Sequence, residues 1–147
     1  MIQRIQSVYL LLAGIIPAFT FCTPIITFSN GSSLMSYAIT GTEEHFISCP
    51  WGVLAFTVLS ILTALFTIFN YKNRPRQIRL CNLLLIFILL LYVSILAYSY
   101  AFENRHNVSM SYSIGLFLPL ISYVSGWLAR RAIRKDEALV RAAERFR

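Results

Sequence analysis

The chain has 147 residues, of which 57% are hydrophobic and 13% are charged, and its formal net charge is +7. Soluble domains average about 45–50% apolar and about 25% charged residues, so this composition excludes a disordered chain and argues against an ordinary soluble enzyme. The length corresponds to a single domain, which we take as residues 1–147.

Four long windows contain no Asp, Glu, Lys or Arg, namely residues 5–42, 45–71, 80–102 and 106–129. A bilayer core of about 30 Å accommodates about 20 apolar residues of helix, and a charge at its centre is costly. We therefore predict an all-α membrane protein with four transmembrane helices, at about residues 7–26, 51–70, 79–101 and 111–129. Pro17 and Pro119 lie inside the first and fourth of these helices and are expected to kink them.

The basic residues are distributed unevenly between the predicted connections. Except for Arg105, every Lys and Arg lies before the first predicted helix, between the second and third or at the first residue of the third, or after the fourth. Lys and Arg are enriched in cytoplasmic loops, so this asymmetry predicts a multi-pass protein with both termini in the cytoplasm.

The first predicted outer connection carries a turn signal. Asn30-Gly31 favours a type I′ turn, and the residues on either side are rich in β-branched and aromatic types. We predict a small extracytoplasmic β-hairpin at about residues 25–40, with a disordered loop as the alternative. In the second outer connection Val108, Met110 and Tyr112 alternate with polar residues, which makes them candidates for a third strand.

Small and hydroxylated side chains recur at helical spacing within the predicted spans. Small residues allow close helix packing in lipid, and we expect them to form such faces on the first and fourth helices: Gly14, Ala18, Cys22, Gly115, Ser122 and Gly126. On the second helix a polar stripe follows one face: Thr57, Ser60, Thr63, Thr67 and Asn70. The stripe either lines a path for a solute or bonds to backbone carbonyls, and the second interpretation is favoured because no charge accompanies it.

The sequence contains no recognisable catalytic, cofactor-binding or metal-binding motif, so we predict no enzymatic activity and no cofactor. His45 and His106 are read as solvated loop residues rather than as metal ligands together with Glu43, Glu44 and Glu103. Cys22 and Cys49 fall on the same predicted outer side and are candidates for a disulfide, whereas Cys81 is expected to be a free, buried thiol.

The last segment, at about residues 130–146, is rich in helix formers and predicts an amphipathic cytoplasmic helix. Its first basic residues are expected to contact anionic lipid headgroups or a partner protein: Arg130, Arg131, Arg134 and Lys135. Nucleic-acid binding is disfavoured, because acidic residues alternate with the arginines and no aromatic platform accompanies them.

The two ends of the chain, MIQRIQSVYLLL at residues 1–12 and RAIRKDEALVR at residues 131–141, resemble a bacterial family of short four-span integral membrane proteins. This family is catalogued as a domain of unknown function, so the resemblance implies a bacterial cytoplasmic membrane and supplies no activity to carry over. Because the predicted spans lack buried ionisable residues but carry small-residue faces, and the tail is rich in helix formers, we expect a non-enzymatic structural or accessory subunit of a membrane complex. It would contact the lipid bilayer and either another membrane or cytoplasmic protein or a second copy of itself. The alternative is a small oligomeric transporter or channel lined by the polar stripe.

Overall fold

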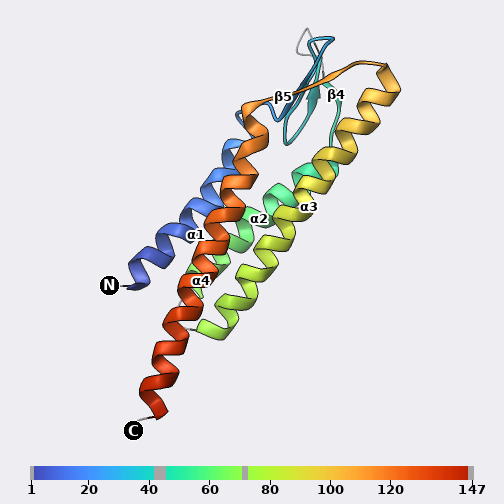
Figure 1. Ribbon diagram of the computed structural model, residues 1–147. Coiled ribbons are helices and arrows are strands. Elements are labelled where there is room, and N and C mark those ends of the chain that lie inside the picture. The colour runs from blue at the N-terminus through green and yellow to red at the C-terminus, as the bar shows by residue number, and fades with distance from the viewer. Residues whose placement is uncertain (1, 42–45, 71–72, 146–147) are drawn as a thin grey trace.

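The computed structural model describes residues 2–41, 46–70 and 73–145. Its main elements are four helices, which run alternately in opposite directions as a bundle: α1 (Ile2–Phe19), α2 (Trp51–Phe69), α3 (Arg74–His106) and α4 (Phe117–Arg145) (Figure 1). Helices α1 and α3 each pack against both α2 and α4. We call the end of the bundle that carries the strands the sheet end and the opposite, arginine-rich end the basic end.

The sheet has five antiparallel strands, in the order β4-β3-β2-β1-β5. The strands are β1 (Ile26–Phe28), β2 (Ser33–Leu34), β3 (Ile39–Thr40), β4 (Phe46–Ser48) and β5 (Met110–Tyr112). Strand β5 pairs with β1, so the sheet joins the α1–α2 connection to the α3–α4 connection. A hairpin between β1 and β2 and a strand from the second connection are present as the sequence predicts, but the sheet is larger than the predicted hairpin.

The turns of this sheet differ from the predicted ones. Gly31 has a positive φ of 79°, but among the described non-glycine residues a positive φ occurs only at Asn107. The predicted type I′ turn is therefore wrong, because it needs positive φ at both Asn30 and Gly31. Instead, residues 29–31 form a three-residue loop, which is closed by a 2.8 Å hydrogen bond from the Phe28 N–H to the carbonyl of Ser32.

The segment that follows is also broken where a continuous strand is expected. The Met35 N–H donates to the carbonyl of Ala38 at 2.8 Å, which closes a turn between β2 and β3. Ser36 is buried in this turn, and its Oγ lies 2.6 Å from the Thr20 Oγ1 just after α1. This polar contact holds the turn against the end of α1.

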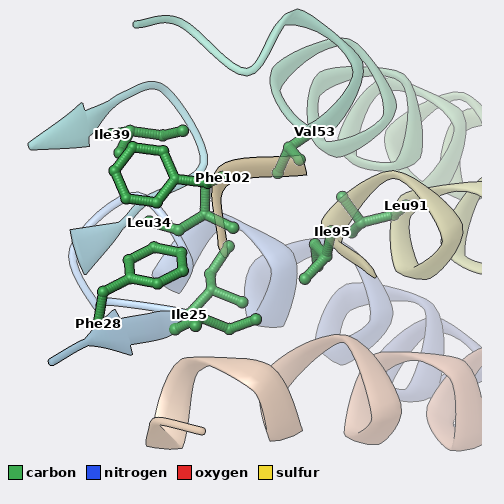
Figure 2. Close-up of a cluster of buried hydrophobic side chains, with 9 residues drawn as sticks. Ile25, Phe28, Leu34, Ile39, Val53, Leu91, Ile95 and Phe102 are labelled. Carbon is green, nitrogen blue, oxygen red and sulfur yellow. The ribbon is translucent and has the colours of Figure 1, made fainter. Parts of the chain in front are cut away.

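The sheet end is filled by one apolar cluster. Side chains of the strands point toward α3 and the start of α2 (Figure 2), and the Phe28 and Phe102 ring centroids are 4.5 Å apart. The cluster comprises Ile25, Ile26, Phe28, Leu34, Ile39, Val53, Leu91, Ile95 and Phe102. Burial of these side chains seats the sheet on the bundle.

Only α2 and α3 are long and apolar enough to cross a membrane among the described helices, whereas the sequence analysis predicts four such helices. The apolar part of α1 is restricted to Gln6–Phe19, because the chain then turns toward β1. The apolar part of α4, residues 117–129, is preceded by β5 and the 3-10 turn η1 (Ile114–Leu116). At 1.5 Å per residue it covers about 20 Å, less than a hydrocarbon core of about 30 Å.

Helix α4 continues past its apolar part to Arg145, so the predicted cytoplasmic helix is the second half of one long helix. This half projects beyond the other helices at the basic end (Figure 1). Pro17 lies in the last turn of α1 and Pro119 in the first turn of α4, so neither proline lies in the middle of its helix, where a kink is expected.

Candidate functional site

Large apolar side chains are exposed on all four helices, and we call this surface the apolar belt. In α2 and α3 only 33% of each apolar window is buried, which distinguishes these helices from the enclosed core helix of a soluble protein. The belt comprises Val8, Leu11, Leu12, Ile15 and Phe19 of α1, Val58, Leu59, Leu62, Leu65, Phe66 and Phe69 of α2, Leu83, Ile86, Leu89, Leu90, Val93 and Leu96 of α3, and Phe117, Leu120, Ile121 and Val124 of α4.

The polar stripe of α2 lies inside the bundle. Thr57, Ser60, Thr63 and Thr67 are buried, and each hydroxyl donates to a carbonyl of its own helix at 2.6–2.7 Å. Asn70, at the end of α2, donates from its Nδ2 to the Phe66 carbonyl at 2.9 Å. A pore between copies of the chain would lie on the outside of each bundle, where these four buried hydroxyls are not accessible.

The predicted small-residue faces lie at several different contacts. A Cβ added to Gly14 would lie 3.0 Å from the Cβ of Ala64 on α2, which shows a close approach of α1 and α2. On α4, Ser122 donates from its Oγ to the Ala13 carbonyl of α1 at 2.7 Å, and Gly126 faces Leu85 of α3. The other members lie elsewhere: Gly115 packs on Pro24, Ala18 is half-buried and Cys22 is exposed.

Long polar side chains link the helices at the basic end, and the sequence analysis did not single them out. Gln6 of α1 donates to the Ala132 carbonyl of α4 at 3.3 Å, and Gln77 of α3 donates to the Thr67 carbonyl of α2 at 3.4 Å. The Arg74 Nη2 lies 3.3 Å from the Asp136 Oδ2 and joins α3 to α4. The signal in the sequence that could have indicated these interhelical contacts is the position of polar residues close to the ends of the charge-free windows.

Two clefts lined by arginines lie at the basic end. The first, the α4 cleft, has a volume of about 160 Å³ and is lined by Trp127, Arg130, Arg131 and Arg134. The second, the α2–α3 cleft, has a volume of about 340 Å³ and is lined by Asn70, Arg76, Arg79 and Leu80. Lys135, which the sequence groups with the α4 arginines, is exposed and does not line the α4 cleft.

The α4 cleft combines a cation–aromatic contact with an unsatisfied donor. The guanidinium carbon of Arg131 lies 5.7 Å from the centroid of the Trp127 ring. The Nε of Arg130 is buried without a hydrogen-bond partner. A buried donor that lacks an acceptor is costly, so this position of the Arg130 side chain costs free energy in the structure.

The cysteines are all free thiols: Cys22 is exposed, Cys49 is half-buried and Cys81 is buried. The structure therefore does not contain the candidate Cys22–Cys49 disulfide, while Cys81 is a free, buried thiol as expected. Three residues of the weighed metal cluster, Glu43, Glu44 and His45, lie outside the described residues. The residues that the structure describes hold no group of three potential metal ligands, and the ring centroids of His106 and Phe102 are 4.4 Å apart.

A search among curated proteins finds no match to this chain. The family model for the domain of unknown function DUF4293 matches residues 2–146, which is almost the whole sequence. The chain therefore belongs to the DUF4293 family.

Proposed function

We propose that this protein is an integral membrane protein whose four helices all cross a bacterial cytoplasmic membrane. The apolar belt supports this proposal most strongly, because it continues around the outward faces of α1 and α4 as well as α2 and α3. Soluble monomers rarely expose contiguous apolar patches of more than a few hundred Å². The short apolar parts of α1 and α4 would be accommodated by local thinning of the bilayer.

The proposed orientation follows from the two ends of the bundle. The arginine-lined clefts and the projecting half of α4 lie at the basic end, which the positive-inside tendency assigns to the cytoplasm. The sheet end, with Arg105 near the end of α3, would face the outside. Both termini would then be cytoplasmic.

Within the membrane we propose a structural or accessory role without catalysis. The helices are joined by hydrogen bonds such as that of Ser122 with the Ala13 carbonyl, and the hydroxyls of the polar stripe are bonded within α2. Beyond the apolar belt, α4 exposes Leu139 and Val140, at 53% and 39% of their surface. Exposed apolar side chains on a helix that leaves the bundle suit a contact with another protein. The partner would be a membrane or cytoplasmic protein, or a second copy of this chain.

Photo-crosslinking in native membranes tests both parts of this proposal. A benzophenone amino acid is placed at Leu139 on the projecting half of α4 and, as a matched control, at Leu89 in the middle of the apolar belt. We expect a discrete protein adduct from position 139 and lipid adducts from position 89, identified by mass spectrometry. Absence of lipid adducts at position 89 would contradict the membrane location, and absence of a protein adduct at position 139 would contradict the accessory role.

A further inference from the structure

From the composition of the α4 cleft we infer that it binds the phosphate of an anionic phospholipid. This inference rests on the proposed function, because it needs the bundle to lie in a bilayer. Arg130, Arg131 and Arg134 lie three, four and seven positions after Trp127, so the periodicity of the helix places the four residues on one side of α4. The cleft of about 160 Å³ between them is open to the surface of the protein.

The charge of the cleft is not neutralised by its lining. Among the described residues, three guanidinium groups and an indole ring line the cleft, and its lining contains no carboxylate. The nearby Asp136 is turned to α3, where its Oδ2 lies 3.3 Å from the Arg74 Nη2. Guanidinium groups match phosphate oxygens by donating two parallel hydrogen bonds, so three of them around one cleft suit a phosphate.

The position of the cleft favours a lipid phosphate over a free one. On its sheet side, the exposed side chains of α4 are apolar members of the belt: Phe117, Leu120, Ile121 and Val124. Trp127 is 44% exposed where the belt ends and the arginines begin, and Trp is enriched at the level of the headgroups. A phospholipid with its phosphate in the cleft would therefore place its acyl chains along the belt.

The α2–α3 cleft provides a comparison within the same molecule. It also lies at the basic end, but it has two arginines, Arg76 and Arg79, in a wider cleft of about 340 Å³. Its lining contains no tryptophan. General attraction of anionic lipid to the basic end would affect both clefts, whereas a specific site would distinguish them.

The two tryptophans of the chain allow a direct measurement, because Trp51 begins α2 at the sheet end and Trp127 lies in the α4 cleft. The variant Trp51→Phe retains only Trp127, and Trp127→Phe retains only Trp51. Each is reconstituted in vesicles of phosphatidylcholine and phosphatidylglycerol, with bromine on the acyl chains of one lipid or the other. Quenching of fluorescence by each brominated lipid gives the relative affinity of the two lipids for the surface next to the tryptophan.

We expect phosphatidylglycerol to be preferred over phosphatidylcholine about five- to tenfold at Trp127 and not at Trp51. In the Trp51→Phe background, replacing Arg130 and Arg134 by Gln should remove this preference. Replacing Arg76 and Arg79 by Gln removes the same charge at the same end and should preserve it. Arg131 is left unchanged because it contacts the reporter ring, and Arg134→Gln alone, at an exposed position, replaces the double variant if the latter does not fold.

The outcomes separate this inference from the proposed function. If neither tryptophan is quenched by brominated lipid, the membrane location itself is contradicted. If both are quenched but phosphatidylglycerol is not preferred at Trp127, or both pairs of substitutions act equally, the lipid site is overturned while the membrane location remains. Addition of inorganic phosphate should leave the preference unchanged, and its loss would show that the cleft takes a free anion instead of a lipid.

Discussion

The two ends of the bundle are stabilised in different ways. At the sheet end, strands from two distant connections bury a continuous apolar cluster against α2 and α3. At the basic end a smaller apolar cluster of Leu10, Cys81, Ala129 and Ile133 is buried, and side chains such as Gln6, Arg74 and Gln77 add hydrogen bonds and an ion pair between the helices. Burial of several large side chains contributes more than such polar contacts, which contribute about 1 kcal/mol each. The comparison therefore predicts that the sheet end carries more of the stability, and that the basic end carries the surface available for binding.

The largest effect is expected for Phe102→Ala at the sheet end. Phe102 is only 7% exposed and contacts Phe28, so its removal leaves a cavity between α3 and the sheet. We expect the free energy of unfolding in mild detergent to fall by about 3–5 kcal/mol. As a control, Tyr100→Ala on the same helix, where the side chain is 63% exposed, should change it by about 0.5 kcal/mol or less. Equal effects of the two substitutions would show that the apolar cluster does not hold the sheet in place.

A smaller loss is expected for Gly115→Ala, where β5 leads into α4. An added Cβ would lie 2.3 Å from the carbonyl oxygen of Pro24, a backbone atom, so the backbone must move. We expect a loss of about 1–3 kcal/mol, measured as above. At Gly126, an added Cβ would make an ordinary contact with Leu85 at 3.4 Å, and Gly126→Ala should be nearly neutral. A neutral Gly115→Ala would mean that the approach of η1 to Pro24 is looser than the structure has it.

The sequence predicts the helices of the bundle better than the segments that lead into the sheet. Charge-free windows fix α2 well, since the predicted 51–70 matches Trp51–Phe69. The same signal extends the first and fourth predicted helices too far toward the sheet end, to residue 26 and from residue 111, whereas α1 ends at Phe19 and α4 begins at Phe117. An apolar run has the same composition whether it continues as a helix or enters a strand. Pairing of Ile26 with Tyr112 depends on a contact between distant segments, which local propensity does not specify.

The residues of the candidate site could also be predicted only in part from the sequence. The sequence groups Arg130, Arg131, Arg134 and Lys135 by their charge. Which of them share a cleft depends on how α4 is rotated against α1 and α3, and this rotation is set by packed residues such as Ala129 and Ile133. The structure accordingly leaves Lys135 out of the α4 cleft and adds Trp127, which the sequence analysis did not select.

The smallest effect is expected at the basic end, for the ion pair between Arg74 and Asp136. The side chains are 28% and 15% exposed, so water screens their attraction. A double-mutant cycle with Arg74→Gln and Asp136→Asn should give a coupling of about 0.2–1 kcal/mol in the free energy of unfolding. This coupling should shrink as salt rises from about 0.1 M to about 1 M, because the screening length falls from about 10 Å to about 3 Å. The loss caused by Phe102→Ala should not shrink with salt, because apolar burial does not depend on charge. If the coupling energy of this ion pair exceeded the loss of unfolding free energy caused by Phe102→Ala, the proposed division of stability between the two ends would be reversed.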